Sequence, residues 1–124
     1  GPGHDGLYGS EGDDVLVGGA GRDGFFFNTA PGPDNVDRIL DFSVADDTIQ
    51  FNNASFATIG PDGVLAAGAF VIGAAAADAN DRVIYNSATG ALYYDSDGTG
   101  AAAAIQIATL GIGLALTNAD FFVV

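Results

Sequence analysis

A nine-residue unit is repeated near the N-terminal end of the sequence, as GSEGDDVLV at residues 9–17 and GGAGRDGFF at residues 18–26. Both copies have glycine at positions one and four, aspartate at position six and a large apolar residue at position eight. A partial copy comes first and places Gly3, Asp5 and Leu7 in the same register. Units repeated in register indicate that each forms one structural element and buries its apolar side chain against its neighbours. Ordinary hairpin turns are the alternative, because clusters of glycine and aspartate also mark turns.

These residue types in this order suit a calcium ion. The aspartate at position six supplies carboxylate oxygen, and the glycines permit positive φ angles that turn backbone carbonyl oxygens toward a common point. Calcium takes roughly six to eight oxygen ligands in a flexible cage. A short strand is expected after each aspartate, with the position-eight side chains Leu7, Leu16 and Phe25 pointing inward. The ligands predicted from the repeats are Asp5, Gly12, Asp14, Gly19, Gly21 and Asp23.

The composition excludes several classes of protein. The chain has 124 residues, the length of one domain. Three basic residues against sixteen acidic ones give a net charge of −13, which opposes binding to nucleic acid and to anionic membranes. Cysteine is absent, so disulfides, zinc–thiolate sites and thiol catalysis are excluded. The apolar stretch at residues 101–116 is shorter than the roughly 20 residues of a membrane-spanning helix, and neither membrane insertion nor an N-terminal signal peptide is expected.

Downstream of the repeats, the sequence predicts further strands. Residues 37–42 (DRILDF) and 46–51 (DDTIQF) are expected to form two strands, as the family resemblance described below implies. More strands are expected over residues 69–72, 82–86, 91–94, 103–110 and 121–124, with a hairpin turn at 87–90 and little helix. Alternation places Tyr93 and Tyr94 on opposite faces, so that at most one of them lies in the core.

Residues 95–100 (DSDGTG) have two interpretations. They resemble the start of an EF-hand loop, with Asp95 and Asp97 at positions one and three and a glycine at position six. Position twelve is Gln106 rather than the bidentate glutamate that such a loop requires. A hairpin turn is therefore favoured, and a calcium site is the alternative.

The repeats resemble the glycine-rich nonapeptide repeats of the RTX family, whose consensus is GGxGxDxUx with U a large apolar residue. The resemblance implies a short parallel β-roll over residues 3–27, in which two repeats make one turn. It also implies two or more calcium ions between loops stacked on the same edge, with Asp5 and Asp23 on one edge and Asp14 on the other. The site opened by Asp14 needs a later partner, and a solvated carboxylate is the alternative for each of its three candidates, Asp34, Asp37 and Asp41.

The second half resembles the C-terminal region of serralysin-type peptidases and of other RTX exoproteins, most clearly at residues 83–95 (VIYNSATGALYYD). The resemblance implies an all-β fold in which the β-roll continues into a mainly antiparallel C-terminal part. Residues 3–124 are expected to form one domain, with the calcium-binding roll and its closing strands at 3–51 and the antiparallel part at 52–124. Gly1 and Pro2 are expected to be the remnant of a cleaved expression tag. The zinc-binding HExxH pattern of those peptidases is absent from the chain.

The last five residues are Asp120, Phe121, Phe122, Val123 and Val124. An acidic residue followed by apolar residues at the extreme C-terminus resembles the uncleaved export signal of type I secreted proteins, which an ABC-transporter complex reads. The resemblance implies secretion to the extracellular space by a Gram-negative bacterium. The expected partners are the transporter complex and the N-terminal domains of a parent protein. A final edge strand is the alternative, and both hold if the signal is read in the unfolded chain.

The expected function is therefore that of a calcium-binding module that folds outside the cell, at the C-terminus of a larger secreted protein. The alternative is a calcium-dependent adhesive or glycan-binding module, which exposed aromatic side chains on one sheet face would favour. The chain itself is not expected to be an enzyme, because nothing distinguishes any one of its aspartates as a general acid or base. Any enzyme activity, such as that of a peptidase, would belong to the parent protein.

Overall fold

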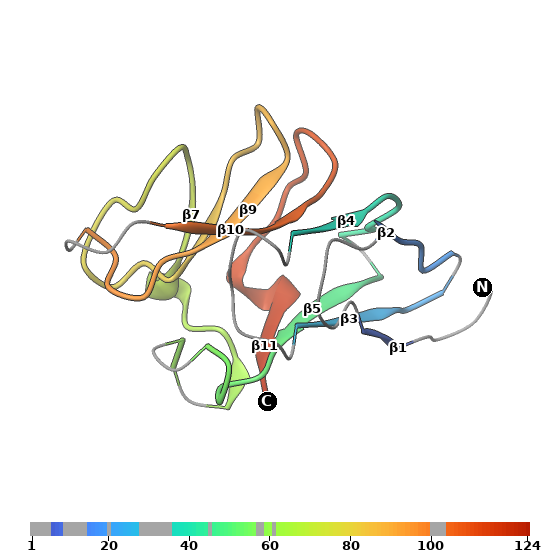
Figure 1. The fold of residues 1–124 in the computed structure, drawn as a ribbon, viewed down its shortest axis with the longest axis horizontal. Coiled ribbons are helices and arrows are strands. Elements are labelled where there is room, and N and C mark those ends of the chain that lie inside the picture. Colours follow the sequence, from blue (N-terminus) through green and yellow to red (C-terminus); the bar gives the residue numbers. More distant parts are fainter. Residues whose placement is uncertain are drawn as a thin grey trace.

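The computed structural model describes residues 6–8, 15–19, 21–27, 36–44, 46–56, 59–60, 62–99 and 104–124. In these ranges the chain is all-β and forms two sheets (Figure 1). They contain no α-helix, and no helical segment in them is long and apolar enough to cross a membrane. Two 3-10 turns, η1 (Ala67–Ala69) and η2 (Asn118–Asp120), come immediately before β7 and β11. The strands are β1 (Gly6–Tyr8), β2 (Val15–Leu16), β3 (Gly24–Phe27), β4 (Asp37–Ile39), β5 (Thr48–Phe51), β6 (Gly63–Val64), β7 (Phe70–Ile72), β8 (Val83–Tyr85), β9 (Ala91–Tyr94), β10 (Ile105–Thr109) and β11 (Phe121–Val123).

Consecutive strands of the N-terminal part alternate between the two sheets. Sheet A has the order β1-β3-β5-β11-β6, and sheet B has the order β2-β4-β10-β9-β8-β7. β1 pairs with β3 and β3 with β5, while β2 pairs with β4, and all three pairings are parallel. The chain therefore crosses from one sheet to the other after each strand. The parallel pairing predicted for the repeat region is confirmed for these strands.

The C-terminal part is mixed rather than mainly antiparallel. β9 lies antiparallel to both β8 and β10, and β6 lies antiparallel to β11. However, β7 pairs parallel with β8, and β10 and β11 extend the two N-terminal sheets by pairing parallel with β4 and β5. The prediction of a mainly antiparallel region therefore holds for three pairings of these strands and fails for the other three. Alternation of side chains shows which face of a strand is buried, but it does not show the direction of the neighbouring strand.

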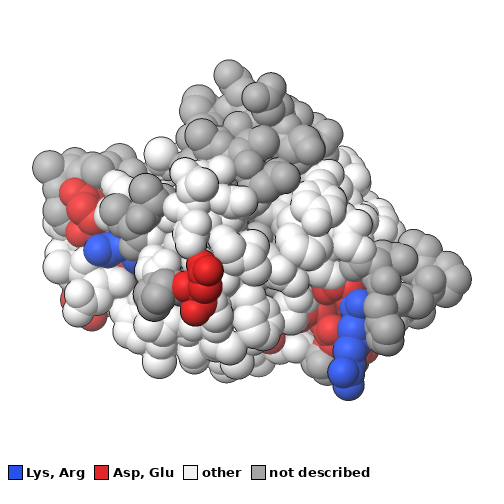
Figure 2. All heavy atoms as spheres, turned by 90° about the horizontal axis from the view of Figure 1, so that it is seen from below, with Lys and Arg blue, Asp and Glu red and all other residues white. Residues whose placement is uncertain are grey.

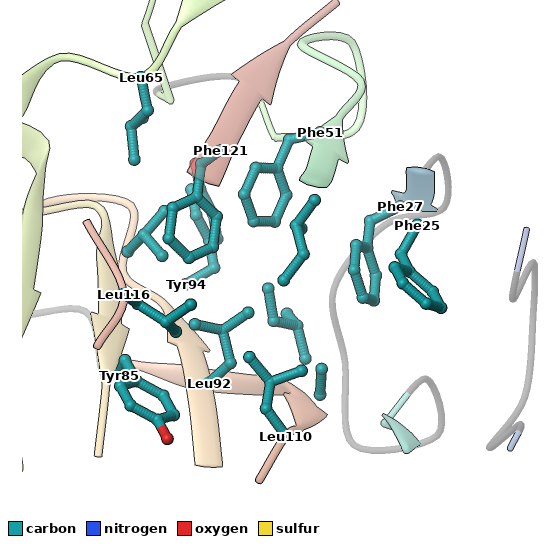
Figure 3. Close-up of a cluster of buried hydrophobic side chains, with 14 of the residues drawn as sticks. Phe25, Phe27, Phe51, Leu65, Tyr85, Leu92, Tyr94, Leu110, Leu116 and Phe121 are labelled. Atoms are coloured by element: carbon teal, nitrogen blue, oxygen red, sulfur yellow. The ribbon is translucent and has the colours of Figure 1, made fainter. Parts of the chain in front are cut away.

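One apolar core fills the space between the sheets (Figure 3). Among the position-eight side chains of the repeats, Phe25 and Leu16 are buried, whereas Leu7 on the edge strand β1 is half-buried. Ile39 pairs with Leu16 and Ile49 with Phe25, so both take the corresponding inward places on β4 and β5. Burying a side chain of this size contributes about 1.5–3 kcal/mol. The periodic apolar residue is therefore what fixes each short crossing strand to the core.

Aromatic rings connect the N-terminal and C-terminal parts of the core. Phe51 of β5 contacts Phe27, Phe56 and Phe121, with ring centroids 5.8, 5.1 and 6.0 Å away. Phe56 makes an edge-to-face contact with Tyr94 of β9 at 5.0 Å. Figure 3 shows the rings of Phe51 and Phe121 side by side in this cluster. The terminal strand β11 is thus a central strand between β5 and β6, and not the edge strand that the sequence offered as an alternative.

The predicted hairpin turn joins β8 to β9. Gly90 has a φ of 80°, in the left-handed region that favours glycine, and its N–H donates to the carbonyl of Asn86 at 2.8 Å. Tyr94 is buried and Tyr93 is half-buried, as the alternation predicted. The segment that contains residues 95–100 also joins two antiparallel neighbours, β9 and β10, as a hairpin does.

Candidate metal centre

Aspartates come directly before the parallel strands of sheet A. Asp23 precedes β3 and Asp47 precedes β5, and the pairing of Gly24 with Thr48 places the two aspartates at equivalent positions. Both side chains are buried, each with a relative exposure of 2%. Asp5 holds the same place in the sequence before β1, but it lies outside the described residues. At the end of sheet A where β3 and β5 begin, each of these two strands is therefore preceded by a buried carboxylate.

Asp47 ties two loops together and was not among the predicted ligands. Its Oδ1 accepts a hydrogen bond from the N–H of Asp23 at 2.9 Å, and its Oδ2 accepts one from the N–H of Ser43 at 2.8 Å. The sequence does hold a signal for this residue in its spacing. Asp47 precedes the inward-facing Ile49 by two residues, as Asp23 precedes Phe25.

Asp41 forms a second clamp between the same loops. Its Oδ1 accepts a hydrogen bond from the N–H of Gly18 at 3.0 Å, and its Oδ2 accepts one from the N–H of Gly19 at 2.6 Å. Residues 40–44 and 46–47 thus pack on residues 17–19 and 21–23, at the end of the strands where β3 and β5 begin. The sequence made Asp41 a candidate partner of Asp14, which directly precedes β2. The structure places Asp41 after the end of β4, and thus not at the end of the strands where β2 begins.

Glycines make room for the Asp23 carboxylate. A β-carbon on Gly18 would collide with Oδ2 of Asp23, so the carboxylate lies directly against the backbone of its own loop. Gly19 and Gly21 have φ angles of 80° and 104°, which few residues other than glycine adopt. The repeat therefore supplies the residues that this curled loop requires. A buried carboxylate in a glycine-lined loop offers oxygen atoms as ligands and fits a hard cation such as Ca²⁺.

The loops at the other end of the strands, where β2 and β4 begin, lie only partly within the described residues. Asp37 begins β4 and is buried, with a relative exposure of 2%. It comes one residue before Arg38, which pairs with Val15 of β2, and in the sequence Asp14 comes one residue before Val15. Asp37 is therefore the candidate whose place in the pattern matches that of Asp14. The other predicted ligands lie outside the described residues: Asp5, Gly12, Asp14 and Asp34.

The acidic turn after β9 is organised by local contacts. Asp95 is buried, and its Oδ1 accepts a hydrogen bond from the N–H of Asp97 at 3.2 Å. A β-carbon on Gly98 would collide with the backbone of Asp78 and Ala79, so the turn packs tightly against the loop before β8. The Asp95 carboxylate therefore supports the connection between β9 and β10.

The chain matches no protein-family model and no curated protein. What the candidate site can bind is therefore argued from its own residues. These are the buried carboxylates of Asp23 and Asp47, the half-buried carboxylate of Asp41 and the glycine-rich loop beside them. Within the described ranges, no three aspartate, glutamate or histidine side chains gather as a group that would hold a metal by themselves. Carboxylate and carbonyl oxygens together are the ligands that calcium prefers.

Replacing Asp41 with alanine is expected to weaken the loop clamp without removing a bound ion. The change leaves two backbone N–H groups without their acceptor, and the expected loss of unfolding free energy is about 1–3 kcal/mol. Urea denaturation in calcium measures it. Asp46→Ala is the matched control, because Asp46 is exposed in the same loop and the charge change is equal. A lower number of bound calcium ions in Asp41→Ala alone would show that Asp41 is a ligand instead.

Proposed function

We propose that this chain is a calcium-binding folding module whose N-terminal strands form a short parallel β-roll. The observation that supports it is the stacking of residues 40–47 on residues 17–23, with Asp23 and Asp47 at equivalent buried positions. Calcium would bind between loops stacked in this way. Asp23 would supply carboxylate oxygen, and the loop backbone at Gly19 and Gly21 would supply carbonyl oxygens. The preceding loop, which contains Asp5, would share the ion.

Charge gives calcium control over folding in this proposal. The chain has a net charge of −13, and its negatively charged side chains repel one another more strongly in the compact folded state than in the unfolded state. Three carboxylates, those of Asp23, Asp41 and Asp47, lie in two adjoining loops. Bound cations offset the repulsion and crosslink the loops, so that the free energy of binding becomes free energy of folding.

The same proposal makes the chain the C-terminal end of a larger protein exported by the type I pathway of a Gram-negative bacterium. Its support is the terminal run of one acidic and four apolar residues. In the folded chain Phe121 and Val123 are buried in sheet A, so only an unfolded chain would present the whole run to a transporter. Low calcium inside the cell would keep the chain unfolded for passage, and high calcium outside would fold it.

Calcium stoichiometry, measured by isothermal titration calorimetry, tests the proposed site. Asp23→Asn is expected to lose about one bound ion per chain, because an amide offers one neutral oxygen where the carboxylate offers two charged ones. Asp62→Asn makes the same charge change on an exposed residue outside the loops and is expected to bind as many ions as the wild type. Equal stoichiometry and affinity in all three proteins would contradict the site.

A further inference from the structure

The outer face of sheet A carries a row of side chains that crosses all five of its strands. The row is formed by cross-strand pairs and runs through Tyr8, Phe26, Gln50, Phe122 and Val64. Its members on β3, β5 and β11 alternate with buried residues, so the row faces away from the core. Tyr8 and Val64 are 56% and 52% exposed, and the three side chains between them are half-buried. None of the five is charged.

Two aromatic rings at the start of the row have defined positions. The rings of Tyr8 and Phe26 are stacked, with centroids 4.5 Å apart and planes inclined by 11°. Gly6 and Gly24 leave the space for the Phe26 ring, because β-carbons at these positions would lie 3.2 and 3.1 Å from it. A β-carbon on Gly24 would also lie 3.3 Å from Nε2 of Gln50. The ring and the amide therefore lie over the same glycine, and the row presents aromatic surface beside a hydrogen-bonding group.

Three hollows meet at Gln50. One of about 420 Å³ extends toward the start of β3 and β5. A second of about 220 Å³ lies between the Tyr8–Phe26 pair and Val124, and a third of about 550 Å³ lies over Phe122 and Gly63. Polar side chains border these hollows on both sides of the row: Arg22, Asp23, Asp46, Thr48, Asn52 and Asp62.

We propose that this face binds a neutral polysaccharide in an extended conformation. A sugar ring has an apolar C–H face, which packs on aromatic rings, and a rim of hydroxyl groups, which exchange hydrogen bonds with amide and hydroxyl side chains. Tyr8, Phe26 and Phe122 supply the first kind of surface. Gln50 and its neighbour Asn52 supply the second. Adjoining hollows along one face suit a chain of sugars, whereas a single small molecule would be held in a more enclosed pocket.

The charge of the molecule favours a neutral sugar over the other occupants of such a face. A net charge of −13 repels an acidic polysaccharide, and it also opposes docking of a second copy of the chain. Figure 2, seen from the side of sheet A, shows that most of the described surface there is uncharged and that charged residues form a few separate groups. A protein partner would also bury the polar side chains around Gln50, which the hydroxyl groups of a sugar would satisfy.

Affinity gel electrophoresis of the whole chain in calcium, with soluble β-1,4-glucan, β-1,4-xylan or dextran in the gel, tests the proposal. At least one of these neutral polymers is expected to retard the wild type. Tyr8→Ala and Gln50→Ala are each expected to weaken the retarding interaction about five- to tenfold. Tyr93→Ala removes the same kind of ring from the other sheet and is expected to bind like the wild type. Thermal melts in calcium confirm that each variant is folded.

The proposal would be overturned by a lack of retardation with every neutral polymer, by retardation only with the acidic polymer polygalacturonate, or by equal weakening in Tyr93→Ala. Self-association of the wild type that Tyr8→Ala abolishes, seen by sedimentation, would overturn it in favour of a contact between copies. The calcium stoichiometry of Tyr8→Ala is expected to equal that of the wild type. A failure to bind sugar is therefore distinguishable from a failure of calcium-dependent folding.

Discussion

Removing calcium with a chelator is expected to unfold the N-terminal parallel strands and to leave part of the C-terminal strands folded. The loops that join β2 to β3 and β4 to β5 concentrate carboxylates, which repel one another when no cation is bound. The strands β8 to β10 have their own buried residues, including Tyr85 and Leu92. The Tyr85 hydroxyl donates to the carbonyl of Gly111 and accepts from the N–H of Leu114, which anchors this part independently of the loops.

The expected size of this effect is large for so small a domain. An ion present at 100 times its dissociation constant, with no affinity for the unfolded chain, stabilises the folded state by about 2.7 kcal/mol. Two such ions contribute about 5 kcal/mol, which is comparable with the whole stability of a typical domain, about 5–15 kcal/mol. Chelation should therefore lower the melting temperature by roughly 15 °C or more.

Hydrogen exchange with and without chelator locates the change within the chain. Backbone amides of β3 and β5 are expected to lose protection in chelator, while those of β8 and β9 keep part of theirs. The second group is an internal control, since it reports any general loosening of the molecule. Identical cooperative melting and identical protection in both conditions would mean that calcium does not control the fold.

The strands could largely be predicted from the sequence because their signals are local. The position-eight residues Leu16 and Phe25 predicted the inward face of β2 and β3. β9 has the predicted bounds, and Tyr94 rather than Tyr93 is its core residue. In each case the pattern of two alternating faces decides which side chain is buried.

The long-range arrangement could not be predicted in the same way. Nothing local in β10 or β11 indicates that they pair in parallel with β4 and β5, because that pairing depends on which sheet edges the repeats leave open. The two-residue strand β6 is too short to give a periodic signal. Asp41 and Asp47 could be recognised as carboxylates near strand ends, but the backbone groups that they hold in the first loop, those of Gly18, Gly19 and Asp23, lie more than twenty positions earlier.

Deleting residues 121–124 is expected to unfold the chain as well as to block its export. Phe121 and Val123 are buried, with relative exposures of 0% and 2%, and β11 pairs with a strand on each side. Loss of a buried phenylalanine costs about 3–5 kcal/mol, and loss of the buried valine costs about 1.5–3 kcal/mol more. Their sum approaches the stability of a typical domain. The deletion therefore removes a structural strand together with the candidate export signal.

Two point substitutions separate these roles. Val124 is half exposed, and its backbone N–H donates to the carbonyl of Phe51 at 2.9 Å while its carbonyl accepts from the N–H of Asn53 at 3.0 Å. Val124→Asp should therefore melt in calcium within a few degrees of the wild type. Phe121→Asp places a charge at the centre of the aromatic cluster, where burial without a partner costs several kcal/mol, and should not fold.

The decisive measurement is the fraction of each variant that leaves the cell when the chain is fused to its exported parent. If the terminal run is a type I signal, both substitutions should trap most of the protein inside, although only Phe121→Asp is unfolded. If the run is only a strand, Val124→Asp should be exported like the wild type. Phe121→Asp should then be exported as well and fail to fold outside, because an exporter that threads unfolded chains does not depend on the native core. Wild-type export of Val124→Asp would thus contradict the signal while leaving the calcium site intact.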